Sequence, residues 1–185
     1  MPAHRALKLA PKVQAQLQEV RDIVGLLNLD HEALSRSSRD PESQLIVAKH
    51  KLIRGQLVIW YTLIDEFLAN RMCRYFFGTK RSFPQLWRTA KFKTFNHFIV
   101  GTLTLLEKLR LARAITPIPK AICQDIERLN ALRNGMAHAF FPENLRTLKP
   151  LWRGKDVFSL EGLRTLKEDM DTVISYFARR EPWPR

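Results

Sequence analysis

Cysteine is scarce in this sequence, and the cysteines present form no binding pattern. Cys73 and Cys123 are the only two among 185 residues, and neither CxxC nor Cys/His spacing surrounds them. Neither a disulfide framework nor a zinc site is therefore predicted, and both side chains are expected to be reduced, buried thiols. The densest acidic group, Glu168, Asp169 and Asp171, has no histidine near it. We therefore expect no metal site and no cofactor.

Long apolar runs and nucleotide-binding motifs are also missing. The most apolar run, LVIWYTLI at residues 57–64, is far shorter than the roughly 20 residues that cross a bilayer. The first residues, MPAHRALKLAPKV, lack the apolar core of a signal peptide. We therefore expect a soluble, cytoplasmic protein with no membrane partner. The absence of a Walker loop, a GxSxG motif and a dinucleotide fingerprint argues against phosphate-cradling loops and acyl transfer.

Acidic residues are few compared with basic ones. The chain has 31 Lys and Arg against 18 Asp and Glu, a net charge of +13, which favours a polyanionic partner. No Asp or Glu occurs between Phe67 and Leu106. Seven cations in that stretch, called the basic segment below, are Arg71, Arg74, Lys80, Arg81, Arg88, Lys91 and Lys93. Aromatic residues near these cations include Phe83, Trp87, Phe92 and Phe95.

The basic segment predicts an RNA-binding surface. Scattered Lys and Arg can follow a phosphate backbone, and aromatic side chains can stack on bases. The alternative is an ordinary solvated basic face that covers core aromatic residues.

Apolar spacing predicts an all-α bundle of four to five helices with an extra N-terminal helix. The helices are expected over residues 12–28, 43–77, 94–113, 117–140 and from about 159 onward. The polar stretch 30–43 is predicted to be a linker, and 141–158 an irregular connection with a short strand pair. Residues 1–42 are therefore assigned to an N-terminal helix and linker, and residues 43–185 to the bundle.

The middle of the second expected helix is unusually apolar. Residues 57–68, LVIWYTLIDEFL, are apolar on nearly every face except at Thr62, Asp65 and Glu66. Such a helix packs on more than one side, and so few other helices would cover it poorly. We therefore expect a homodimer.

The hexapeptide RNGMAH, at residues 133–138, ends an apolar helical stripe. Arg133 has a planar charged fork that suits phosphate oxygens, and His138 can change its charge near neutral pH. On a regular helix the two lie about 140° apart, whereas Asn134 and His138 share a face. Gly135 could permit a distortion. The alternative is that Arg133 and His138 are cations favoured by a helix C-terminus, and that Asn134 makes a local hydrogen bond.

The stretch LNALRNGMAHAFF, at residues 129–141, resembles the signature of the HEPN family. That signature is an arginine, a polar residue, and a histidine after four to six intervening residues; here four intervene. The resemblance covers roughly residues 43–180. It implies a dimer whose two motifs face each other across a cleft, and a metal-independent endoribonuclease, as in many toxins of toxin–antitoxin pairs. Other HEPN domains are non-catalytic RNA- or protein-binding and dimerisation modules, which is the alternative function.

The resemblance also implies roles for individual residues. Arg133 would hold the scissile phosphate, and Asn134 would orient that phosphate or its neighbour. His138 would be the general acid or base when the ribose 2′-hydroxyl attacks. Asp65 or Glu66 could support His138; otherwise they lie on a solvated face, or Glu66 pairs with Arg71.

One position departs from a branch of the family. Phe140 stands where HEPN toxins paired with nucleotidyltransferase antitoxins have a tyrosine that the partner modifies. Control through that tyrosine is therefore not expected, although an antitoxin or another regulatory protein remains an expected partner.

Overall fold

A computed structural model describes residues 10–27, 29–78, 80–137 and 150–180. The chain divides into two compact units, residues 1–52 and 53–185. The division falls inside the long helix α3 (Pro41–Phe77), whose first residue lies close to the boundary expected from the sequence.

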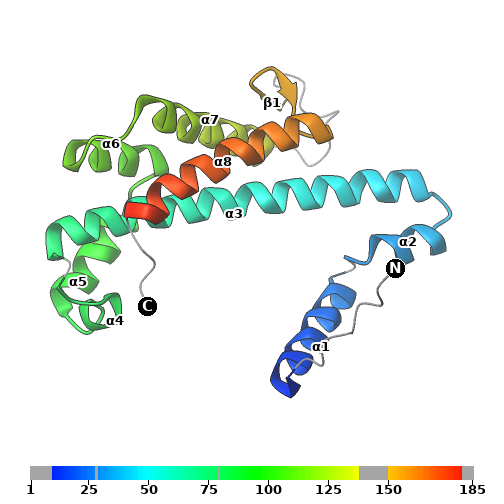
Figure 1. Cartoon of the computed structure of the whole chain (residues 1–185), viewed down its shortest axis with the longest axis horizontal. Helices are drawn as coiled ribbons and strands as arrows, with labels where there is room; N and C mark the ends of the chain where they lie inside the picture. Colours follow the sequence, from blue (N-terminus) through cyan, green and yellow to red (C-terminus); the bar gives the residue numbers. More distant parts are fainter. Residues whose placement is uncertain (1–9, 28, 79, 138–149, 181–185) are drawn as a thin grey trace, which may run out of the picture. The chain divides into compact units, whose positions relative to one another are not determined.

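The first unit contains α1 (Pro11–Leu26), α2 (His31–Ser37) and the start of α3. The helix expected over residues 12–28 is confirmed, but the stretch predicted to be a linker contains α2 (Figure 1). Asp30 caps α2, since its carboxylate accepts a hydrogen bond from the backbone N–H of Ala33 at 3.0 Å. The linker is predicted because this stretch is polar and shows no apolar periodicity. A helix of seven residues is too short to show such a periodicity.

The second unit is helical apart from one small hairpin, so the all-α prediction is confirmed. It contains the rest of α3 and α4 (Phe83–Leu86), α5 (Ala90–Phe95), the π-helix η1 (Asn96–Val100), α6 (Leu105–Ile115), α7 (Lys120–Ala137), β1 (Leu151–Trp152), β2 (Lys155–Asp156) and α8 (Leu160–Arg180). The expected strand pair is β1 and β2, which run antiparallel. The final helix also begins where the sequence predicts.

The predicted continuous helix over residues 94–113 is wrong. The chain leaves the helix after η1 and re-enters it at α6, where Thr104 and Glu107 form a capping box. The Glu107 carboxylate accepts the backbone N–H of Thr104 at 2.7 Å. These hydrogen bonds hold the pKa of Glu107 below its usual value. The cap satisfies backbone donors and fixes the start of α6.

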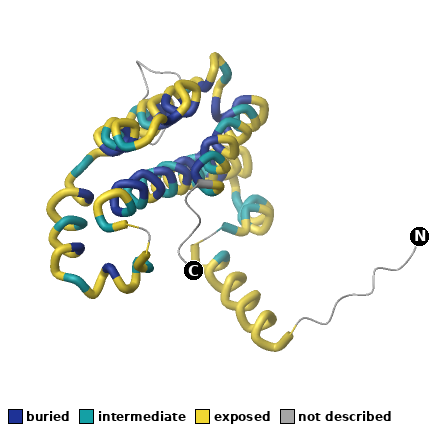
Figure 2. The backbone as a smooth tube through the Cα atoms, turned by 60° about the vertical axis from the view of Figure 1, so that its left-hand side comes forward, coloured by how far each residue is buried: buried dark blue, intermediate teal, exposed yellow. Residues whose placement is uncertain are grey.

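Two groups of buried side chains form the core of the second unit. The larger group joins α3, α6, α7, α8 and the hairpin, and includes Ile64, Ile126 and Phe177. The smaller group joins α3, α4, α5 and η1 around Met72 and Phe92. Buried positions follow the sides of α3, α7 and α8 that face one another (Figure 2).

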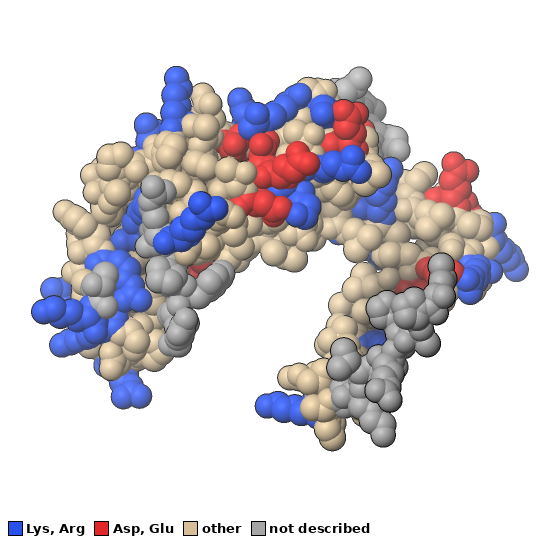
Figure 3. Space-filling view, viewed as in Figure 1, with Lys and Arg blue, Asp and Glu red and all other residues tan. Residues whose placement is uncertain are grey.

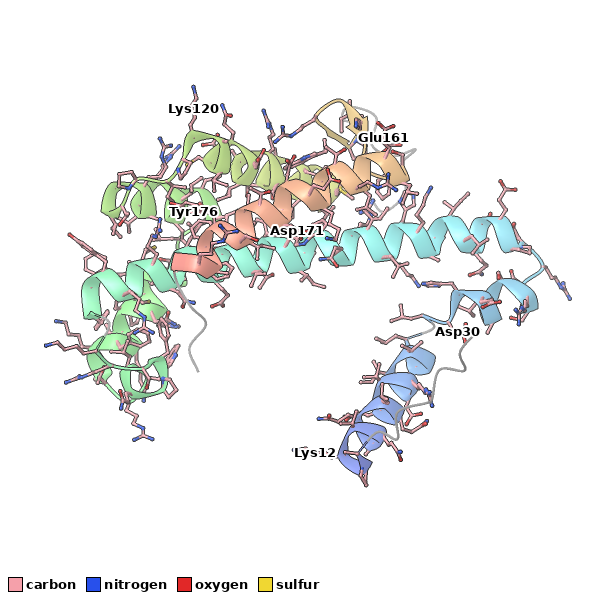
Figure 4. The ribbon with its side chains drawn as sticks, in the orientation of Figure 1. Lys12, Asp30, Lys120, Glu161, Asp171 and Tyr176 are labelled. Atoms are coloured by element: carbon pink, nitrogen blue, oxygen red, sulfur yellow. The ribbon has the colours of Figure 1, made fainter. Side chains whose placement is uncertain are left out.

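The hairpin is fastened to α7 and α8 by charged side chains. Trp152 donates its indole N–H to Asp169 at 2.7 Å, and Arg153 binds Asp169 at 2.6 Å and the buried Asp125 at 3.3 Å. Lys155 pairs at 2.8 Å with Glu161, at the start of α8 beside the hairpin (Figure 4). These contacts fix the C-terminal helix against the helix that carries Arg133.

Candidate functional site

Arg133 and Asn134 lie near the end of α7, with both side chains exposed. Arg133 donates a hydrogen bond from Nη1 to the Asn134 Oδ1 atom at 3.1 Å. Its guanidinium lies over the ring of Tyr61, 5.1 Å from the centroid, which is a cation–π contact. Among the described acids, none pairs with Arg133, so its positive charge is available to an anion.

Arg54, on α3, is a second arginine at this site, and no motif in the sequence indicates it. Its Nη1 atom donates to the backbone carbonyl of Met136 at 2.6 Å. Together with Arg133, Leu57, Val58 and Met136, it lines a cavity of about 250 Å³. Burial lowers the pKa of Arg54 below its usual value, but an arginine stays charged near neutral pH. Two guanidinium groups therefore border one small cavity.

The hydrogen bond from Arg54 is relevant to the alternative that Arg133 is only a cation favoured by a helix C-terminus. The Met136 carbonyl accepts a hydrogen bond from Arg54 of α3, whereas Arg133 itself contacts Tyr61 and Asn134. Gly135 lies within α7 and has no positive φ, so Arg133 and Asn134 are on a continuous helix. His138 and Phe140 lie outside the described residues, as does the end of the helix expected to reach residue 140.

Asp65 and Glu66, expected as supports for His138, border a different cavity. Lys108 of α6 donates from Nζ to Asp65 Oδ2 at 2.6 Å, and the Lys108 side chain is only 7% exposed. Glu66 is exposed and forms no ion pair with a described residue, so the alternative in which it pairs with Arg71 is not seen. Both acids line a cavity of about 490 Å³ between α3, the α4–η1 region and α6.

The basic segment is only partly a surface. Arg71 is buried, and its guanidinium lies 5.5 Å from the centroid of the Phe177 ring. Arg74 is partly buried over Phe83 at 4.5 Å and donates to the carbonyl of Arg81 at 2.8 Å. Arg71 therefore does not lie on the predicted surface, whereas Arg74 is still partly accessible.

The other five cations of the segment are exposed: Lys80, Arg81, Arg88, Lys91 and Lys93. They gather around α4 and α5, whereas acidic side chains gather over α8 (Figure 3). Of the aromatic residues expected to stack on bases, Phe92 belongs to the core, Phe83 and Phe95 are partly buried, and Trp87 is 46% exposed. Trp87 is thus the best-exposed of the predicted stacking residues.

Neither a metal centre nor a bilayer-spanning helix is found in the part of the chain that the structure describes. Comparison with protein-family models, curated proteins and solved structures gives no match.

Proposed function

We propose that this chain is a metal-independent endoribonuclease whose reaction centre lies at the C-terminal end of α7. The observation that carries the proposal is the arrangement of Arg133 and Arg54 around one cavity of about 250 Å³. Two guanidinium forks that border one cavity suit the oxygens of a phosphodiester. Residues 133–138 resemble the HEPN signature, in which His138 would be the proton-transfer residue that such chemistry needs.

RNA carries its own nucleophile, so the protein has to supply only charge and proton transfer. In the proposed step the ribose 2′-oxygen bonds to phosphorus, the bond from phosphorus to the 5′-oxygen breaks, and a 2′,3′-cyclic phosphate forms. The 2′-hydroxyl proton leaves with a base, and the departing 5′-oxygen gains a proton from an acid. His138 performs one of these transfers. Arg133 and Arg54 offset the negative charge that develops on the phosphate oxygens, while Asn134 positions Arg133.

A second copy of the chain would complete the site. Val58 and Ile59, on α3, are 55% and 59% exposed, and Val58 lines the same cavity as Arg133. Covering these apolar side chains with the matching face of another copy removes them from water and brings two motifs together. One copy could then provide the acid and the other the base. A partner protein that covers this face would inhibit the enzyme, as a toxin or defence nuclease requires.

The chemistry can be tested with matched substrates. An RNA oligonucleotide and the DNA of the same sequence carry the same phosphate charge, but only RNA has the 2′-hydroxyl. We expect cleavage of the RNA alone, with fragments ending in 2′,3′-cyclic phosphate. Cleavage of the DNA, or RNA fragments ending in a 3′-hydroxyl, would contradict the mechanism.

The second candidate function is RNA binding without cleavage. The observation that favours it is the group of five exposed cations around α4 and α5, in a stretch without acids. Binding of this kind depends on salt, because each neutralised phosphate releases counterions. It would persist without His138, whereas cleavage would not.

A further inference from the structure

The cavity that holds Asp65 has the dimensions and polar groups of a ligand site. Its volume of about 490 Å³ lies in the range of roughly 300–1,000 Å³ that is usual for small-molecule sites. Lys108 neutralises Asp65 inside it. Glu66 adds a second carboxylate that has no described cation as a partner. The cavity therefore has one carboxylate in excess, inside a strongly basic protein.

Several polar groups of this cavity have hydrogen-bonding capacity to spare. Within the described residues, the side chains of Glu66, Asn70 and Asn96 form no hydrogen bond, although all three line the cavity. The charge on Glu66 is felt at Cys73, which also lines the cavity: burial, followed by the charge of Glu66, raises the pKa of that thiol to about 11. The amides of Asn70 and Asn96 and the carboxylate of Glu66 can therefore form hydrogen bonds with one ligand.

The wall opposite α3 has an unusual backbone. Asn96 is the first residue of the π-helix η1, a form that occurs mostly as short insertions and often at functional sites. Gly101, which also lines the cavity, sits where a Cβ atom would lie 3.2 Å from the carbonyl oxygens of Asn96 and His97. Trp87 provides an aromatic wall, with its ring held edge-on at 5.1 Å from Phe92.

We infer that this cavity binds an unpaired guanine base of single-stranded RNA. Guanine presents two adjacent N–H donors, N1–H and the 2-amino group, and a carboxylate can accept both in parallel. Uracil offers one donor on that edge, and adenine and cytosine each place an acceptor beside their amino group. Glu66 therefore favours guanine, the amides of Asn70 and Asn96 are available to its remaining polar atoms, and Trp87 stacks on the ring.

The surroundings favour a base within a nucleic acid. Arg88 and Lys91 are exposed and follow Trp87 closely in the chain, in a stretch without acids. Cations beside a carboxylate-bearing cavity would hold phosphates while the base enters. This inference rests on the proposed function only in naming the RNA that the enzyme would recognise, since the binding itself requires neither His138 nor Arg133.

The test measures equilibrium binding with His138→Ala protein, which is not expected to cut the probe. The probes are UUUGUUU, UUUAUUU and UUUIUUU ribonucleotides, where I is inosine, which lacks the 2-amino group, and also GMP. We expect the guanine probe to bind at least about tenfold more tightly than the adenine probe, with inosine between them. Glu66→Gln should abolish this preference and leave the salt-dependent affinity, while Trp87→Ala weakens binding of all three RNAs.

Glu127→Gln, which changes an exposed glutamate on α7, is the matched control and should keep the preference. Equal affinity for the guanine and adenine probes, or a preference that survives Glu66→Gln in a variant that unfolds at the wild-type temperature, would overturn the inference. If GMP binds but the three RNAs bind equally well, the ligand is a free nucleotide, and the inference that the base belongs to RNA is overturned. Cleavage is assayed separately in wild-type protein, so loss of the guanine preference and loss of ribonuclease activity are distinguishable.

Discussion

Arg54 and Met136 are 82 residues apart in the chain, yet the Arg54 Nη1 atom donates to the Met136 carbonyl oxygen at 2.6 Å. The bond joins α3 to α7 close to Arg133 and Asn134. A hydrogen bond from a charged donor is stronger than one between neutral groups. The same side chain therefore stabilises α7 and places positive charge beside Arg133.

Arg54→Ala is expected to reduce both stability and cleavage. Losing a hydrogen bond from a charged donor should lower the free energy of unfolding by about 1.5–3 kcal/mol, as measured by urea denaturation. Arg113→Ala, at an exposed arginine of α6, is the control and should change stability by less than about 0.5 kcal/mol. Equal effects of the two substitutions would show that the bond to Met136 does not stabilise α7.

Two glycine substitutions should have opposite effects. A Cβ at Gly162 would lie 2.0 Å from the backbone oxygen of Asp156, so Gly162→Ala must displace the hairpin and cost about 1–3 kcal/mol or more. Gly135 has no atom within 4 Å of such a Cβ and lies in a helix. Gly135→Ala should therefore stabilise by about 1 kcal/mol and leave cleavage intact. Loss of cleavage in a stable Gly135→Ala protein would mean that the site needs a helix distortion there.

Charge reversal is expected to separate the proposed RNA-binding surface from the proposed reaction centre. Changing Lys80, Arg81, Lys91 and Lys93 to glutamate should weaken binding of a single-stranded RNA and flatten its dependence on salt. The logarithmic slope should fall by about 0.7 for each phosphate that the protein no longer neutralises. Fluorescence anisotropy at several salt concentrations measures both quantities. An unchanged affinity and slope would exclude these four side chains from the interface.

The apolar face of α3 predicts the oligomeric state. Val58→Asp together with Ile59→Asp should convert a dimer into monomers and remove cleavage, because a buried, unpaired charge opposes association. Leu160→Asp, at a side chain that is 74% exposed, is the control and should remain a dimer. Sedimentation equilibrium at micromolar concentration distinguishes these states, and a wild-type monomer that still cuts RNA would contradict the shared-site proposal.

Helix spacing is enough to predict most of the fold. The central helix is predicted from residue 43 to Phe77, because no proline interrupts that run and Asp40–Pro41 supplies a helix start. The break before α6 escapes the prediction, although Thr104 and Glu107 have the spacing of a capping box and could have revealed it. Apolar periodicity alone predicts one helix over residues 94–113, because the periodicity continues past this capping box.

The site is less predictable, because it depends on contacts between distant residues. Arg133 and Asn134 belong to a local motif, whereas Arg54 joins them only through the packing of α3 against α7. Residue type alone also places Arg71 on the surface, but its guanidinium lies over Phe177. Likewise, the ion pair between Asp65 and Lys108 cannot be predicted from the sequence, because it depends on how α6 packs against α3.

The most direct test of the central claim incubates wild-type protein with single-stranded RNA in excess EDTA, beside Arg133→Ala and His138→Ala proteins. We expect wild-type cleavage that EDTA leaves unchanged. His138→Ala should be slower by about a hundredfold to ten-thousandfold, because a positioned proton-transfer group contributes that much, and Arg133→Ala should be slowed comparably. Cleavage that stops in EDTA, or that is equal in wild-type and His138→Ala proteins, would contradict the proposal.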